Sequence, residues 1–157
     1  MKPNIDIGED HLKAVATLLN TLLADEYVLY TKTRNAHWNI QGQNFNELHK
    51  FFESQYDVLD VNIDDIAERV RALGHFALGS LSDFIAVARI SEHTQDFSDQ
   101  KHIMQTLLQD HEGLIRILRK DIIVAGDEHK DLGTADFLTG LMEQHEKMSW
   151  MLRAYAS

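Results

Sequence analysis

The stretch NAHWNIQGQNFNELHKFFE, which runs from Asn35 to Glu53, decides the fold of this chain. Its first residues continue a segment in which apolar residues recur at helical spacing, and its last residues begin another such segment. Gly42 interrupts the pattern, so the stretch predicts a hairpin of two antiparallel helices. It also places His37 and His49 on either side of the turn, with Glu53 four residues after the second histidine.

The two helices of this hairpin are predicted to be long. Apolar periodicity predicts the first over about residues 9–39 and the second over about 44–73, where Gly74 ends it. Helices of this size extend over about 37–45 Å. Their apolar stripes comprise Leu12, Val15, Leu19, Leu22 and Leu23 in the first helix, and Leu48, Phe52, Tyr56, Leu59, Ile63, Ile66 and Val70 in the second.

The second half of the chain predicts another pair of long helices. A short helix starting near Leu81 lies in the link that precedes them. The third long helix begins at Ser98 or Asp99 and ends at Gly126, and Thr134 caps the last. No stretch shows the alternating pattern of a strand. The sequence therefore predicts an all-α four-helix bundle with a short extra helix between the second and third long helices.

Composition limits the class of protein. A length of 157 residues suffices for one domain over 1–157, of which residues 1–8 form a short N-terminal tail. The absence of cysteine excludes disulfides and Cys-ligated metal sites, and we expect most of the nine histidines to be surface or half-buried residues. No leader or membrane-spanning stretch is visible, so we expect a cytoplasmic protein without membrane contact. The formal net charge of −10 attracts cations and repels phosphate backbones.

The second predicted helix carries an acidic face. Its members recur at helical spacing within a sector of about 100°. A solvated surface is the ordinary explanation of such a run. No basic residue of this helix lies on the face, however, and the mutual repulsion of the carboxylates favours a bound cation. The residues of this acidic face are His49, Glu53, Asp57, Asp60, Asp64 and Glu68.

One chain cannot bring the candidate ligands to a single metal ion. His49 and Asp64 lie about 22 Å apart along a helix, whereas ligands of one ion are close neighbours. His37, His49 and Glu53 lie at one height of the hairpin, and Asp64 and Glu68 lie far along the same helix. Two antiparallel copies of this helix, related by a two-fold axis, bring the two groups together and form two identical sites.

The ligand types indicate which metals the site suits. Two imidazoles and three carboxylates without sulfur suit Fe(II), and also Mn(II), Co(II) or Zn(II). No Glu of the chain has His three residues after it, as di-iron centres within one bundle require, so an interfacial site is favoured. A helix-end histidine at His37 and a surface histidine paired with Glu53 at His49 remain the ordinary alternatives.

Four stretches carry a resemblance to a known family, and together they extend over nearly the whole chain. They are HWNIQGQNFNELHKFFE at 37–53, DDIAERVRALG at 64–74, GSLSDF at 79–84 and HEKMSWMLRAY at 145–155. The chain resembles the Dps mini-ferritins, the DNA-protection-during-starvation proteins. The resemblance implies a ferritin-like bundle and a homo-oligomeric shell of twelve subunits with 23 symmetry. It also implies a ferroxidase that oxidises Fe(II), usually with hydrogen peroxide, and stores iron as ferric mineral.

The resemblance assigns roles to the candidate residues by position. The family's ferroxidase ligands, which two chains share at a two-fold interface, correspond to His37, His49, Glu53, Asp64 and Glu68. Glu53 stands where the family usually has Asp, which keeps the charge and changes the reach of the ligand. Trp38 matches the tryptophan beside the site, where it either packs at the interface or intercepts oxidising equivalents.

Pores are expected near the junction of the third and fourth long helices. The acidic residues of this junction are the candidates for the pore lining, with a solvated loop as the alternative. They are Asp127, Glu128, Asp131 and Asp136.

The terminal sequences bear on DNA binding. Members of the family that bind DNA often carry a Lys/Arg-rich tail, whereas MKPNIDIGED and RAYAS contain little positive charge. Direct DNA binding is therefore not expected at physiological salt. The favoured function is an iron-storing ferroxidase that protects against oxidative stress. A structural DNA-compacting protein with a vestigial metal site is the first alternative, and a bundle used for adhesion is the second.

Overall fold

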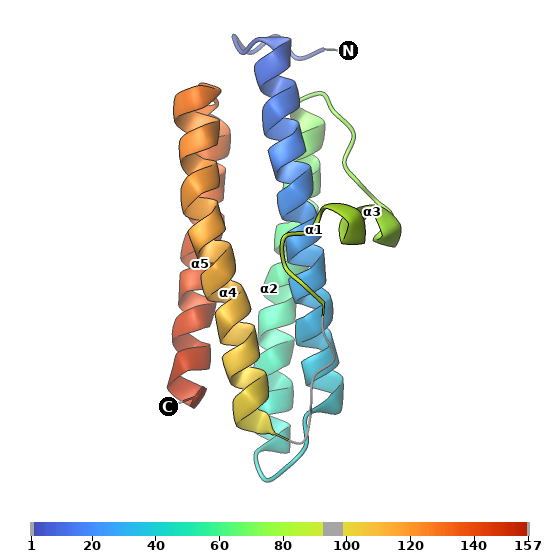
Figure 1. Ribbon diagram of the computed structural model, residues 1–157, viewed down its shortest axis with the longest axis vertical. Coiled ribbons are helices and arrows are strands. Elements are labelled where there is room, and N and C mark those ends of the chain that lie inside the picture. Colours follow the sequence, from blue (N-terminus) through green and yellow to red (C-terminus); the bar gives the residue numbers. More distant parts are fainter. Residues whose placement is uncertain (1, 93–98, 157) are drawn as a thin grey trace.

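The computed structural model describes residues 2–92 and 99–156, and within these ranges it contains helices and no strands. Four long helices form the bundle in Figure 1. They are α1 (Glu9–Asn39), α2 (Phe45–Ala72), α4 (Gln100–Ile123) and α5 (Leu132–Ala156). The short helix α3 (Leu81–Val87) lies outside the bundle against α1. The predicted all-α architecture is confirmed.

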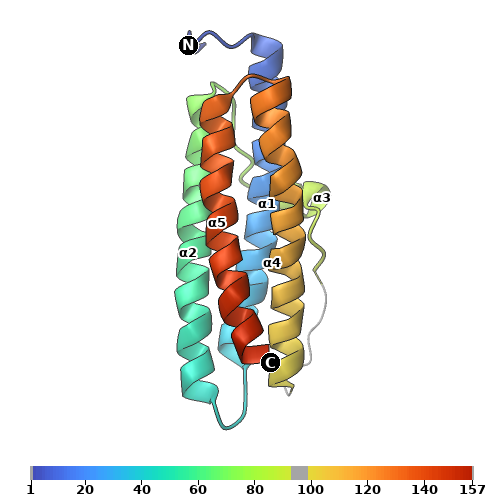
Figure 2. The ribbon, with the colours of Figure 1, turned by 90° about the vertical axis from the view of Figure 1, so that its left-hand side faces the viewer.

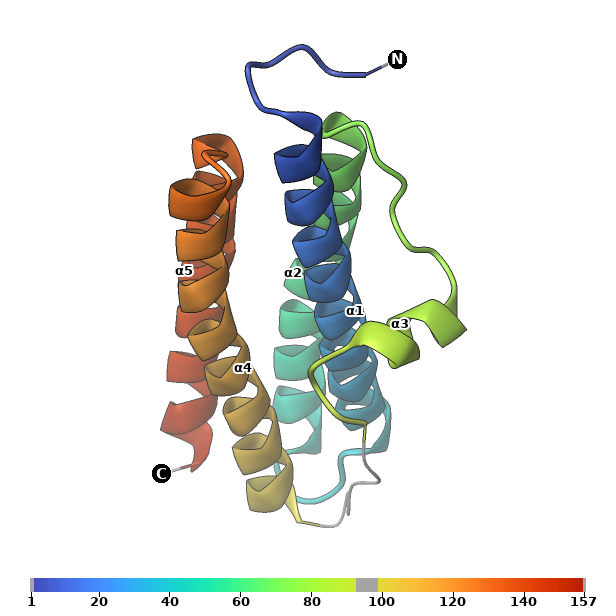
Figure 3. The same cartoon turned by 45° about the horizontal axis from the view of Figure 1, so that its top comes forward.

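The bundle consists of two antiparallel pairs. α1 packs mainly on α2, and α4 packs mainly on α5 (Figure 2). The chain that follows α2 runs along the outside of α1, where α3 lies (Figure 3). Arg89, just after α3, fixes this segment: its Nε donates to Asp25 of α1 at 2.8 Å and its Nη1 donates to Asp121 of α4 at 2.9 Å. No helix of the described part of the chain is both long and apolar enough to cross a bilayer.

The apolar core follows the predicted stripes. All five residues predicted for α1 are buried, and so are five of the seven predicted for α2. The two exceptions, Tyr56 and Ile63, are partly buried, and Ile63 packs against the core. Full burial of a large apolar side chain contributes about 1.5–3 kcal/mol, so these stripes supply the main driving force of the fold.

Glycine and a capping aspartate set three of the helix ends. Gly42 has a φ of 114° in the α1–α2 turn and Gly74 has a φ of 83° after α2, conformations that side chains other than glycine rarely adopt. Asp99 caps α4, because its side chain accepts a hydrogen bond from the His102 N–H at 3.0 Å. The other candidate for this cap, Ser98, lies outside the described residues.

Two predicted helix ends are wrong. Gly126 does not end a helix: α4 runs directly into a π-helical turn, Val124–Glu128, in which Gly126 is buried. A Cβ at this position would lie 3.2 Å from the Cβ of Ala135, so glycine permits close contact with α5. Thr134 does not cap α5, because Asp131 accepts the hydrogen bond of the Thr134 N–H at 2.9 Å. Thr134 therefore lies inside the first turn.

The bundle centre also contains a polar chain that the apolar pattern did not indicate. His111 of α4 and His145 of α5 have Nδ1 atoms 2.9 Å apart, and His145 Nε2 lies 2.6 Å from Oε1 of Glu26 in α1. All three side chains are 0% exposed. Most described histidines are exposed or half-buried, as expected, and this pair is an exception.

Candidate metal centre

His37 and His49 form a stacked pair across the α1–α2 hairpin. Their ring centroids are 3.7 Å apart and the planes differ by 21°. His37 Nδ1 lies 2.7 Å from the backbone oxygen of His49, and His49 Nδ1 lies 2.9 Å from the backbone oxygen of His37. A carbonyl oxygen only accepts, so each Nδ1 carries the proton and donates. Each neutral ring then keeps its lone pair on Nε2, the form in which histidine binds a metal ion.

Neighbouring rings hold this pair in place. Tyr56 of α2 contacts His37 edge-on, with 5.1 Å between ring centroids, and Phe45 stacks on His49 at 5.2 Å. His37 is only 7% exposed. Because packing and backbone hydrogen bonds fix both imidazoles, they are preorganised as ligands.

The three candidate carboxylates are exposed, and they divide into two groups along α2. Helix α2 is uninterrupted over Phe45–Ala72, so the separation of about 22 Å between His49 and Asp64 applies to the folded chain. No group of three or more His, Cys, Asp or Glu side chains among the described residues could hold a metal ion. A single chain therefore presents the imidazoles at one end of α2 and the carboxylates Asp64 and Glu68 near the other. That the imidazoles of one chain and these carboxylates of another form one site stays a prediction.

Glu53 is an exposed residue of α2, one helical turn after His49. Burial raises the pKa of Tyr56, and the negative charge of Glu53 adds to this effect. Tyr56 also touches His37. The joining of Glu53 to the histidine pair in one site stays a prediction.

Sequence reasoning missed a basic residue beside the acidic face. Arg34 of α1 donates to the Tyr30 hydroxyl at 2.6 Å, and its guanidinium lies 4.7 Å from the Tyr56 ring and 5.2 Å from the Trp38 ring. The hydrogen bond with Tyr30 raises the pKa of Arg34, and the carboxylate of Asp60 acts in the same direction. The acidic face of α2 thus has a cationic neighbour from α1. The only signal in the sequence is the position of Arg34, four residues before Trp38.

The four pore candidates differ in their surroundings. Asp127, Glu128 and Asp136 are exposed, and their role as a pore lining stays a prediction. Asp131 is 2% exposed, accepts from Arg69 Nη2 at 3.1 Å and caps α5. Its carboxylate is therefore used within the chain, and this placement does not fit a pore lining.

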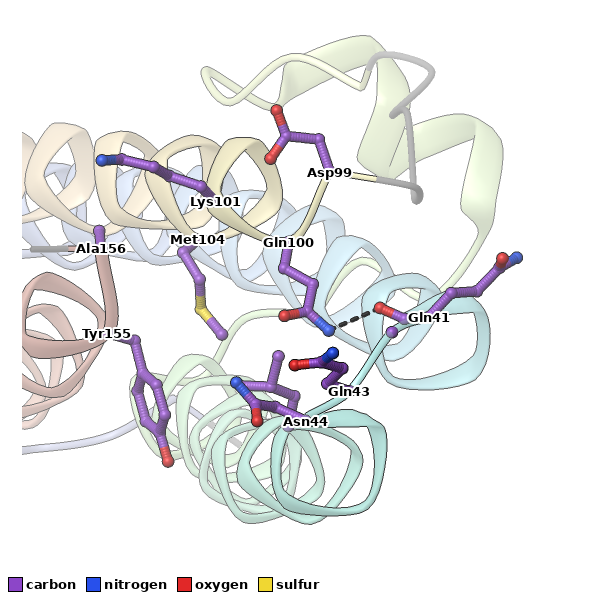
Figure 4. Close-up of a pocket in the computed structure, with 11 residues that line it drawn as sticks. Gln41, Gln43, Asn44, Asp99, Gln100, Lys101, Met104, Tyr155 and Ala156 are labelled. Atoms are coloured by element: carbon purple, nitrogen blue, oxygen red, sulfur yellow. Dashed lines mark hydrogen bonds between the residues drawn. The ribbon is translucent and has the colours of Figure 1, made fainter.

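A cavity of about 520 Å³ opens near the α1–α2 turn (Figure 4). It lies between this turn, the start of α4 and the end of α5, and Gln100 crosses it to donate to the Gln41 carbonyl at 2.6 Å. Tyr155 at its rim donates to Glu47 at 2.9 Å, and burial raises the pKa of this tyrosine. None of the predicted metal ligands lines the cavity.

Comparison with known proteins gives the family. The sequence model of the Ferritin-like domain matches residues 16–157. A Dps protein from Vibrio cholerae, described as a member of a broad superfamily of ferritin-like diiron-carboxylate proteins, has a TM-score of 0.91 and 35% identity. That comparison extends over 100% of this chain and 98% of the other. The chain belongs to the Dps mini-ferritin family.

Other relatives match the chain almost end to end. A DNA protection during starvation protein from Brevibacillus brevis is 38% identical over 141 residues, which is 90% of this chain and 93% of the relative. A low temperature-induced protein from Nostoc sp. is 47% identical over 155 residues, 98% of this chain and 87% of the relative. Membership of the Dps family supports, in general terms, a role in iron storage and in protection against oxidative stress.

Proposed function

We propose that this single-domain protein is a cytoplasmic ferroxidase that oxidises Fe(II) with hydrogen peroxide and stores ferric mineral in a shell of twelve identical chains. Fe(II) is the substrate in this scheme. The observation that carries the proposal is the reciprocal anchoring of His37 and His49. It holds both rings with Nε2 turned away from these hydrogen bonds and available to a metal ion, and Glu53 follows His49 by one turn of α2.

A second chain completes each site in this proposal. Antiparallel α2 helices related by a two-fold axis bring His37, His49 and Glu53 of one chain to Asp64 and Glu68 of the other. Each interface then contains two identical sites.

Exposed apolar side chains support such an interface. Trp38 is 61% exposed and Val61 is 59% exposed. Val61 also lines an open depression of about 400 Å³ together with Asp64. Apolar side chains beside half of a metal site are typical of a surface that another chain covers.

The reaction that we propose balances as follows. Two Fe(II) ions each give one electron to one hydrogen peroxide molecule, whose O–O bond breaks to give two hydroxides. The Fe(III) ions hydrolyse to oxyhydroxide mineral and release protons to water. The imidazoles bind Fe(II), and the carboxylates stabilise the higher charge of Fe(III), which favours oxidation at the site. Consumption of iron and peroxide together limits hydroxyl-radical formation.

Two further roles follow from this scheme. Asp127, Glu128 and Asp136 give the α4–α5 junction a negative surface that would attract Fe(II) to a three-fold pore. Trp38, beside Arg34 and near the histidine pair, either packs against the second chain or is oxidised in place of more sensitive groups.

The proposal is tested by adding Fe(II) without oxygen, then peroxide, and following the absorbance of ferric oxide. Replacement of both His37 and His49 by Ala should slow the oxidation by about 100-fold, because the site loses both neutral ligands. His102→Ala is the matched control, since His102 is an exposed histidine of α4 that is not a predicted ligand. A wild-type rate in the double variant would contradict the proposal.

A further inference from the structure

His11 and His129 form a second accessible imidazole pair, at the opposite end of α1 from His37. His11 lies in the first turn of α1, and His129 follows the π-helical turn between α4 and α5. Figure 2 shows the start of α1 and the α4–α5 junction at the same end of the bundle. The two Nδ1 atoms are 3.0 Å apart, and the rings meet edge-on at 63°. We propose that this pair binds a divalent transition-metal ion through both Nδ1 atoms.

The separation of the two nitrogen atoms fits a shared ion. Metal–imidazole bonds are about 2.0–2.1 Å long, so two nitrogens 3.0 Å apart subtend an angle of about 90° at the metal. This is the angle between neighbouring ligands in six-coordinate geometry, whereas tetrahedral Zn(II) requires a separation of about 3.4 Å. Fe(II), Co(II) and Ni(II) are therefore favoured. The described residues offer no third His, Cys, Asp or Glu in place, so water fills the other positions.

The backbone around His129 is held firmly. Its N–H donates to the Val124 carbonyl at 3.1 Å, across the π-helical turn. Lys130, the next residue, has a φ of 60°, and its ammonium donates to the Asp127 carbonyl at 2.6 Å. Single π-helical turns and left-handed residues other than glycine are concentrated at functional sites. With His11 fixed on a helix, the two ligands are preorganised.

Charge and access also favour a cation at this pair. Glu9 and Asp10 precede His11, and Asp127 and Glu128 precede His129, so exposed carboxylates flank both ligands. Without a metal, one Nδ1–H donates to the other Nδ1. An ion takes both Nδ1 lone pairs, so on binding the donor ring changes tautomer and its proton moves to its own Nε2.

The buried pair in the bundle centre provides a contrast. His111 and His145 have nearly the same Nδ1 separation, 2.9 Å, but both are 0% exposed and Glu26 binds the far side of His145. No ion reaches that pair from solvent without opening the core. His11 is exposed and His129 half-buried, so their pair is open to metal.

The test is equilibrium dialysis with Co(II) on full-length protein in which His37 and His49 are replaced by Ala. This background removes the proposed ferroxidase ligands, so failure of that proposal leaves the result unaffected. We expect His11→Ala and His129→Ala each to abolish one bound Co(II) per chain or weaken its binding by at least about tenfold. We expect the weak visible absorption of six-coordinate Co(II). His75→Ala is the control, because His75 lies near Glu9 at the same end of the bundle.

Three results would overturn the inference. The first is no Co(II) bound to the background protein, and the second is undiminished binding in either single variant. The third is the intense absorption of four-coordinate Co(II). Circular dichroism of each variant confirms that the helices are intact, which the exposed position of His11 leads us to expect.

Discussion

A backbone carbonyl, and not a carboxylate side chain, fixes the imidazole of His37. Because the His49 carbonyl accepts from Nδ1, the ring is held in one tautomer, and the same holds for His49 in return. The two ligands thus depend on the register of the hairpin, which Gly42 sets. Glu53 has no such anchor: it is exposed, and its extra methylene relative to Asp gives it a longer, more mobile reach.

Glu53→Gln tests the contribution of this carboxylate. The substitution keeps the size and removes the charge, so we expect each site to bind Fe(II) about tenfold less tightly. Anaerobic Fe(II) titration measures this. Asp65→Asn is the matched control, since it removes one exposed charge from the same helix at a position that is not a predicted ligand. Equal losses in both variants would show that only general charge matters.

At the scale of the helix, the ends that could be predicted from the sequence are those that depend on the backbone conformation of a single residue. Gly42 and Gly74 have positive φ values that their turns require, and α1 and α2 begin and end within one residue of the prediction. Gly126 was predicted by the same reasoning to end a helix, but in the structure it allows close packing against α5. Thr134 was mistaken for a cap because Ser, Thr and Asp are all good caps, and only the folded backbone selects Asp131.

The candidate site was predictable to the same extent. Helical spacing alone separates the two ends of α2, so the histidine pair and its distance from Asp64 followed from the sequence. Arg34 was not predicted, because its contact with Tyr56 of α2 depends on the rotation of α1 against α2. The burial of His111 and His145 depends in the same way on how four helices meet, and their own neighbours in the sequence do not reveal it.

The buried histidines give α4 and α5 a pH-dependent stability. Burial, and secondarily His145, lowers the pKa of His111 well below its ordinary value of 6.5. Below pH 6.5 the unfolded chain binds a proton there that the folded chain does not, so the free energy of unfolding falls as the pH falls. The slope reaches at most about 1.4 kcal/mol per pH unit. The loss of stability stops once the pH falls below the lowered pKa of His111 in the folded state.

His111→Gln should reduce this acid sensitivity, because the side chain no longer titrates. Urea unfolding above and below pH 6.5 measures the difference in stability for each variant. His102→Gln, at an exposed position of α4, should keep the wild-type dependence. An unchanged pH dependence in His111→Gln would contradict the assignment.

At the scale of the whole molecule, the negative net charge favours binding of metal cations and disfavours binding of DNA. The chain has 25 acidic against 15 basic residues, and the basic groups of the described chain include Arg69 and Arg89, which pair with Asp131 and Asp25. A surface with this balance attracts Fe(II) and repels phosphate.

We therefore expect no retardation of DNA in a gel-shift experiment at physiological salt. DNA binding depends on the release of counterions by clustered Lys and Arg, and the sequence offers no such cluster near either terminus. Measurement at low and moderate salt separates weak electrostatic association from specific binding. Tight binding that persists at moderate salt and depends on the first ten residues would contradict this expectation.

The sharing of one site by two chains is tested most directly by mixing two inactive variants. One carries His37→Ala with His49→Ala, and the other carries Asp64→Ala with Glu68→Ala. When equal amounts assemble together, about half of the two-fold interfaces pair unlike chains, and each of these contains one complete site. About a quarter of all sites are then intact, so we expect about a quarter of the wild-type rate of peroxide-dependent Fe(II) oxidation. A mixture no more active than the separate variants would contradict the account, because sites within single chains cannot be restored by mixing.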